Sequence, residues 1–207
     1  SALFPEVRTM AEAGLKVELI GWVGLAGPAK LPPEVRAWWT RQAVADGSLH
    51  AVVLNSGGAN ACTGEEGYAD TVATAHLAGA KIGVAPGEVA VCSTGLIGEL
   101  LNMDAIRAGI DAGFSELSDD GGANAALAIM TTDTKPKTSA VTGDYSIGGM
   151  AKGAGMLAPQ LATMLVVLTT DASLTTEQAN DALRQAMDQS FDRIDSDGCM
   201  STNDTVI

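Results

Sequence analysis

The sequence predicts a mixed α/β fold in which short buried strands alternate with helices. Hydrophobic residues make up 46% of the 207 residues and glycine occurs 24 times, which is typical of a packed, turn-rich globule. Short apolar runs bounded by turn residues predict strands at His50–Leu54, Glu88–Ser93, Ala126–Thr131 and Met164–Thr170. Aromatic residues are only 4%, so aliphatic side chains and methionine must fill the core.

Helical patterns lie before and between these strands. They predict helices over Pro33–Ala45, Asp70–Ala80, Leu96–Leu117 and Thr175–Phe191. The last is the clearest, because Thr175 and Gln178 form a capping-box pattern before an amphipathic run. Gly109 and Gly113 are candidate break points in the third helix. Gly21–Lys30 reads as a loop or a poor strand, and Asn55–Gly64 reads as a tight active-site or packing loop.

Charge and cysteine content exclude several functions. The net charge is −13, from 25 acidic and 12 basic residues, which argues against binding nucleic acid or anionic membranes through a general field. A buried lysine can still bind a small anion locally. The odd number of widely spaced cysteines predicts neither a disulfide framework nor a metal site and favours a cytoplasmic protein. The most apolar stretch, Leu161–Leu168, is far shorter than the ~20 residues that span a bilayer.

Four glycine- and threonine-rich segments could carry chemistry: Asn55–Gly64, Cys92–Gly98, Gly148–Pro159 and Leu161–Thr170. With Ile129–Asp133 (IMTTD) and Ser201–Val206 (STNDTV), they resemble the ornithine acetyltransferase family, also called glutamate N-acetyltransferase, of arginine biosynthesis. The resemblance runs from about Trp38 to Ile207. It implies a layered α/β/β/α sandwich that needs no cofactor.

The same resemblance divides the chain into three parts. Residues 1–37 match the family poorly, residues 38–162 resemble its alpha subunit, and residues 163–207 resemble the start of its beta subunit. A new strand is predicted to begin at the end of the chain, at Val206 and Ile207. We therefore expect a truncated chain, or one member of a larger assembly.

Thr163 is the candidate nucleophile. Family members cut themselves between a small residue and a threonine, which resembles Ala162–Thr163. A threonine hydroxyl is a poor nucleophile without an adjacent base. A chain-terminal threonine carries its own base, an α-amino group with a pKa of ~7.7–8.0. The alternative is an ordinary β-branched residue in a buried strand.

Thr94 and Gly95 follow a predicted strand and precede a predicted helix. Backbone N–H groups at a helix N-terminus favour an anion. The resemblance implies that the Thr94 hydroxyl and the Gly95 N–H form an oxyanion hole. The alternative is a helix-capping threonine followed by a glycine needed for packing. Nearby Cys92 reads as a buried small apolar residue rather than a nucleophile.

Lys152 lies in a loop-like run of small residues, and the resemblance implies that it binds the substrate carboxylate. The alternative is a solvated surface lysine. The family also has a substrate-binding threonine in the IMTTD segment. Thr131 is favoured over Thr132, although neighbouring residues of a strand point to opposite faces.

Together these residues imply ping-pong acetyl transfer from N-acetylornithine to glutamate through an acetyl-Thr163 enzyme. The resemblance also implies an alpha/beta heterotetramer of cleaved chains. Two alternatives stay open. The chain could be a non-catalytic or uncleaved fragment that binds acyl-amino acids, or an N-terminal-nucleophile amidase or aminopeptidase that releases the acyl group to water.

Overall fold

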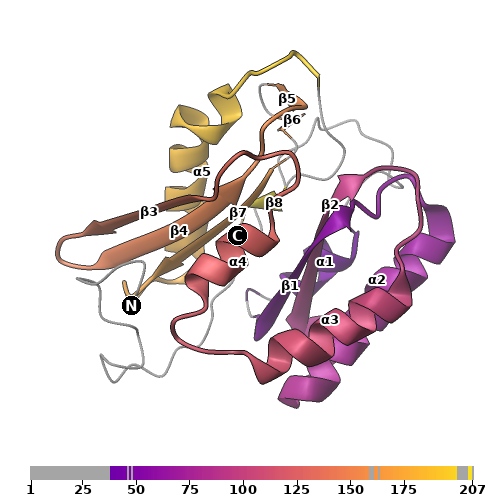
Figure 1. Cartoon of the computed structure of the whole chain (residues 1–207). Helices are drawn as coiled ribbons and strands as arrows, with labels where there is room; N and C mark the ends of the chain where they lie inside the picture. The colour runs from indigo at the N-terminus through magenta and orange to yellow at the C-terminus, as the bar shows by residue number, and fades with distance from the viewer. Residues whose placement is uncertain are drawn as a thin grey trace.

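The computed structural model describes residues 38–45, 47, 49–158, 161–162, 164–199 and 205–206. Within this part of the chain, two sheets lie face to face and helices cover their outer faces (Figure 1). The described helices are α1 (Trp38–Ala43), α2 (Gly64–Ile82), α3 (Met103–Ser115), α4 (Gly122–Ala128), α5 (Thr176–Gln189) and the short 3-10 helices η2 (Pro86–Glu88) and η3 (Phe191–Arg193). The described strands are β1 (Ala51–Gly58), β2 (Val89–Leu96), β3 (Lys137–Thr142), β4 (Ser146–Lys152), β5 (Leu157–Ala158), β6 (Leu161–Ala162), β7 (Leu165–Thr170) and β8 (Thr205–Val206).

The first sheet is the parallel pair β1–β2, which α2 connects as a crossover helix. Val89 of β2 packs with Ala75 and Ala78 of α2, and Ile110 of α3 contacts the same cluster. Helices α2 and α3 therefore form the outer layer on this side (Figure 1).

None of the described helices is long and apolar enough to cross a membrane.

The second sheet has the strand order β3-β4-β7-β8. Strands β3, β4 and β7 are antiparallel, and β8 pairs parallel with β7. Helix α5 covers its outer face, where Met187 packs against Val166 and Val206. The predicted capping box is present, since Thr175 Oγ1 accepts from Gln178 N at 3.2 Å and Gln178 Oε1 accepts from Thr175 N at 2.9 Å. This helix is confirmed.

The inner faces of the two sheets contact each other. Leu165 of β7 packs with Cys92 of β2, and Val52 and Leu54 of β1 complete the cluster. Because strand side chains alternate between faces, Val166 points to α5 while Leu165 points to the other sheet. Lys152 is the cross-strand partner of Leu165 and so lies on the same inner face. The layer order is therefore α/β/β/α, as the resemblance implied.

Several predicted elements are corrected by the structure. Ala126–Thr131 is not a strand, because most of it belongs to α4 and the turn that follows. The segment Gly122–Ala128 (GANAALA) is rich in alanine, the best helix former, and a short apolar run alone does not distinguish a helix from a strand. Helix α3 runs unbroken past Gly109 and Gly113. The β3–β4 hairpin was not predicted from the sequence. Every residue of β3 is exposed, and β4 (SIGGMAK) contains two adjacent glycines and no continuous apolar run.

Helix α3 also begins later than predicted. Strand β2 extends to Leu96, and α3 starts only at Met103, where Asn102 Oδ1 caps it by accepting from Ala105 N at 3.1 Å. The predicted helix over Pro33–Ala45 is present as α1 where the chain is described, and its first part and the predicted loop Gly21–Lys30 lie outside the described residues.

Candidate active site

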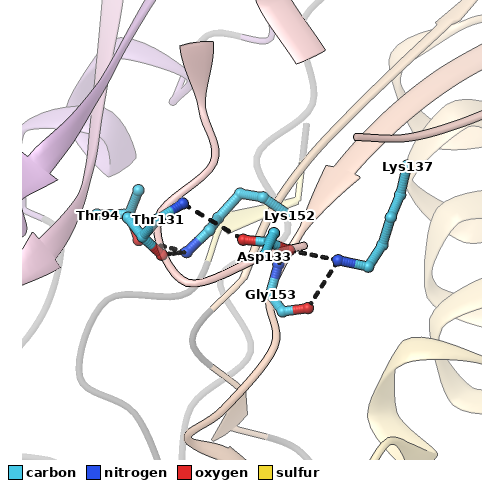
Figure 2. Close-up of polar contacts among 6 residues, drawn as sticks. All are labelled: Thr94, Thr131, Asp133, Lys137, Lys152 and Gly153. Atoms are coloured by element: carbon cyan, nitrogen blue, oxygen red, sulfur yellow. Dashed lines mark hydrogen bonds and ion pairs between the residues drawn. The ribbon is translucent and has the colours of Figure 1, made fainter. Parts of the chain in front are cut away.

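Lys152 is the centre of a polar cluster between the two sheets. It is the last residue of β4 and is 2% exposed. Its ammonium donates to Thr94 Oγ1 at 3.0 Å and to Thr131 Oγ1 at 2.7 Å (Figure 2). The surface-lysine alternative is therefore wrong, and Lys152 belongs to a strand rather than a loop. Three of the residues predicted from the sequence thus meet, although they come from β2, the turn after α4 and β4.

These contacts fix the direction of the hydrogen bonds. An ammonium can only donate, so each threonine oxygen accepts from Lys152 and keeps its own proton to donate elsewhere. A buried ammonium is costly unless it is hydrogen-bonded, and the two hydroxyls offset part of that cost. The cluster combines a positive charge with orientable hydroxyl donors, which suits it to bind a carboxylate or stabilise a developing oxyanion.

Thr94 and Gly95 lie inside β2 rather than at a helix N-terminus. The helix-dipole argument for an anion site is therefore wrong, and so is the helix-cap alternative for Thr94. Thr94 is 2% exposed, and its hydroxyl lies on the inner face with Lys152. Gly95 has φ of 134° and is paired with Gly57, and a Cβ at this position would overlap the Gly57 backbone. Glycine is required here by close strand approach.

The choice between Thr131 and Thr132 has a structural basis that differs from the predicted one. Both residues follow α4 in a turn, so strand alternation does not apply to them. The Thr131 hydroxyl is the one that contacts Lys152, at 2.7 Å. This contact makes Thr131 part of the polar cluster around Lys152.

Asp133 is part of the cluster but was not predicted as a site residue. It is 8% exposed and accepts from Gly153 N at 2.8 Å, from Thr131 N at 3.4 Å and from the ammonium of Lys137 (Figure 2). Burial acts to raise the pKa of Asp133, but the hydrogen bond from Lys137, the two backbone N–H groups and the lysine charge together hold it below its ordinary value. The Asp–Lys spacing of four residues was the available sequence signal.

Cys92 is a core residue, as predicted. It is 4% exposed, and burial raises its thiol pKa to about 12, although hydrogen bonds with Thr205 and Thr40 act in the opposite direction. A thiol with so high a pKa is not a nucleophile near neutral pH.

The predicted nucleophile, Thr163, lies outside the described residues. Ala162 is the last residue of β6, and its backbone pairs with Leu157 of β5. Strand β7 begins at Leu165. In sequence, the predicted cleavage bond therefore follows the last residue of β6 and precedes β7.

Comparison with known proteins decides the family. Residues 35–207 match the model of the ArgJ family. The chain belongs to the ArgJ family. Its relatives include the arginine biosynthesis bifunctional protein ArgJ of Streptomyces coelicolor, which is 62% identical over 170 residues, and that of Bifidobacterium longum, which is 59% identical over 173 residues. Each alignment covers 82% of this chain and 44% of the relative, so the chain spans less than half the length of these ArgJ proteins.

Solved ArgJ-family structures share the fold. The crystal structure of ornithine acetyltransferase complexed with ornithine, from Mycobacterium tuberculosis, has a TM-score of 0.62 and 47% identity over 67% of this chain and 75% of that chain. The ArgJ structure from Bacillus halodurans has a TM-score of 0.56 and 34% identity, over 67% of this chain and 74% of that chain. The family and fold predicted from the glycine- and threonine-rich segments are confirmed.

Proposed function

We propose that this chain carries the acyl-transfer site of an ornithine acetyltransferase, with Thr163 as the nucleophile. The observation that carries the proposal is the buried ammonium of Lys152, held between the hydroxyls of Thr94 and Thr131. Membership of the ArgJ family supports the choice of substrates. We propose N-acetylornithine as acetyl donor and glutamate as acceptor.

In the first half-reaction, the Thr163 hydroxyl attacks the acetyl carbonyl of N-acetylornithine and its α-amino group takes the hydroxyl proton. The Thr94 hydroxyl and the Gly95 N–H would stabilise the tetrahedral oxyanion. Its collapse breaks the C–N bond, the proton moves to the leaving amine, and ornithine departs from an acetyl-Thr163 ester. The glutamate amine then attacks this ester, forms N-acetylglutamate and restores the Thr163 hydroxyl.

Lys152 supports the assignment of Thr94 as an oxyanion donor. Because the Thr94 oxygen accepts from the ammonium at 3.0 Å, the hydroxyl proton is directed away from Lys152. The positive charge also lowers the energy of an anion nearby, and more so in a buried site than in water. We propose that Lys152 binds the substrate carboxylate and that the Thr131 hydroxyl lies beside it.

Thr163 has a free α-amino group only after its bond to Ala162 is cut. We propose that maturation is an N-to-O acyl shift at Ala162–Thr163 followed by hydrolysis of the ester. Sheet pairing supports retention of both pieces, because β4 precedes this bond and β7 follows it, and the two strands pair from Ile147 and Thr170 to Lys152 and Leu165. Two such cleaved chains would form the proposed cytoplasmic heterotetramer.

Two measurements test this proposal. Intact-mass spectrometry follows the 21.0 kDa chain during incubation, and two fragments that meet at Ala162 and Thr163 are expected. Acetyl transfer from N-acetylornithine to glutamate is measured in parallel, with the full-length Streptomyces coelicolor relative as positive control for the assay.

The two alternative functions, a non-catalytic binding fragment and an amidase, each give a different result. One stable chain without transfer would favour a non-catalytic binding fragment. Release of free acetate without N-acetylglutamate would favour an amidase. Either outcome contradicts the proposal.

A further inference from the structure

We propose that Asp133, together with Lys137, is a positioning residue that fixes the relative placement of Thr131 and Lys152. This inference rests on the proposed function, because it assigns a role within the same site. Asp133 accepts hydrogen bonds from the backbone of Thr131 and of Gly153, the neighbour of Lys152, so it would act on a substrate only through Thr131 and Lys152.

The contacts of Asp133 join the two segments that carry the site residues. Its Oδ2 accepts from the backbone N–H of Thr131 at 3.4 Å, and its Oδ1 accepts from the backbone N–H of Gly153 at 2.8 Å. Thr131 in turn accepts from Lys152 through its hydroxyl at 2.7 Å, and Lys152 is covalently bonded to Gly153. The four residues therefore form a closed ring (Figure 2).

Lys137 holds the ring from the solvent side. Its ammonium pairs with Asp133 Oδ1 and donates to the carbonyl of Gly153 at 3.0 Å. The Asp133 side chain is fully shielded from solvent, whereas Lys137 is 44% exposed. A shielded carboxylate persists only if donors compensate for its lost hydration, and here two backbone N–H groups and one ammonium do so.

The backbone at Gly153 explains why such a ring is needed. Gly153 has φ of 151°, a conformation that L side chains rarely adopt, and it directly follows the strand that carries Lys152. A glycine at this point leaves the chain free to turn, and the carboxylate of Asp133 removes that freedom. A site of this kind depends on placement within about 0.5 Å. We therefore expect that replacing Asp133 makes the position of Lys152 less fixed.

The test uses the full chain with Asp133→Asn and Lys137→Gln. Lys135→Gln is the matched control, since it removes the same charge from an exposed position in the same segment. The first readout is the rate at which a water-soluble, amine-reactive acetylating reagent labels each lysine, measured by peptide mass spectrometry. Lys81 is 43% exposed and serves as the internal reference for rapid labelling.

In the wild type, Lys152 should be labelled far more slowly than Lys81, because it is 2% exposed. Loss of a charged hydrogen bond is expected to raise the population of the locally opened state, in which Lys152 is accessible, by about tenfold. Asp133→Asn should therefore speed Lys152 labelling by about tenfold. Lys137→Gln should act in the same direction, Lys137→Arg should restore slow labelling, and Lys135→Gln should leave it unchanged.

The second readout is kcat and KM for acetyl transfer. Positioning predicts about a tenfold lower kcat/KM in Asp133→Asn at temperatures where circular dichroism shows the variant to be folded. Unchanged Lys152 labelling in both Asp133→Asn and Lys137→Gln would overturn the inference, whether or not the wild type transfers acetyl groups. Normal slow labelling in a wild type that neither cleaves nor transfers would count against the proposed function alone.

Discussion

The ammonium of Lys152 lies 3.0 Å from the hydroxyl of Thr94, although 58 residues separate them in sequence. Thr94 belongs to the β1–β2 pair and Lys152 to the four-stranded sheet. Their hydrogen bond therefore crosses between the two sheets. The site exists only when the sheets are packed against each other, so its chemistry depends on the core formed by Leu165 and Cys92.

Replacement of the proposed nucleophile should abolish both of its functions. Thr163→Ala removes the hydroxyl, so neither the N-to-O shift nor the acetyl-enzyme can form. Intact-mass spectrometry should show a single chain, and acetyl transfer should be lost. Thr163→Ser, which keeps a hydroxyl, is the matched control and should still be cut. Self-cleavage at this bond in Thr163→Ala would show that another group attacks it.

Lys152→Met should separate binding from stability. Methionine fills a similar volume without a charge, so it keeps the packing of the lysine stem and removes only the ammonium that donates to Thr94 and Thr131. Loss of a charged hydrogen bond to the carboxylate should weaken ornithine binding by about tenfold to a hundredfold, measured by titration calorimetry. Lys81→Met, at an exposed ion pair with Asp111, should bind as the wild type does. Unchanged binding in Lys152→Met would contradict the role of Lys152.

Gly95→Ala should destabilise the fold strongly. The added Cβ would overlap the Gly57 backbone, and φ of 134° is strained for alanine. We expect the free energy of unfolding in urea to fall by about 3 kcal/mol. Gly113→Ala is the control: it lies within α3 with open space around it, and should stabilise by ~0.5–1 kcal/mol. An equal effect of the two substitutions would be incompatible with the observed strand approach.

Asp133 should contribute to acid unfolding. Its folded-state pKa is held below the unfolded value of about 3.9, so its stabilisation is complete above that value and is lost as pH falls through the folded-state pKa. Urea unfolding measured from about pH 6 to pH 3 should lose stability less steeply in Asp133→Asn than in the wild type.

A carboxylate with the opposite shift provides the control for this acid series. Burial, and then the charge of Glu66, raise the pKa of Asp70, so Asp70 favours folding more as pH falls. Asp70→Asn should therefore make the acid loss steeper. Parallel profiles for Asp133→Asn and the wild type would mean that the hydrogen bonds to Asp133 do not stabilise its charged form.

The three cysteines should differ sharply in reactivity. Cys62 and Cys199 are exposed, whereas Cys92 is buried with a thiol pKa of about 12. At about pH 8, iodoacetamide should modify the two exposed residues and leave Cys92 unmodified until urea unfolds the chain. Peptide mass spectrometry reads each site. Modification of native Cys92 at the rate of Cys62 would contradict its place in the core.

Local patterns were sufficient for the elements whose signals are local. The capping box of Thr175 and Gln178 located α5, and the apolar runs located β1, β2 and β7. The same reasoning failed at α4, where a short apolar run suits a helix or a strand equally. It also missed β3, because an exposed edge strand has no buried face to impose a hydrophobic pattern.

By itself the sequence determined the family, since a characteristic order of segments identifies a fold. It also named Thr94, Thr131 and Lys152 as candidate site residues, because these residue types suit the proposed chemistry. Only the tertiary structure decided which of these residues meet. The alternation of side chains along β4 and β7 turns Lys152 towards Thr94, and a turn after α4 brings Thr131 to the same ammonium. Asp133 emerged only there. Its four-residue spacing from Lys137 was a weak signal in the sequence, and the backbone N–H groups that tie it to the site, one of them 20 residues away at Gly153, have no sequence signature.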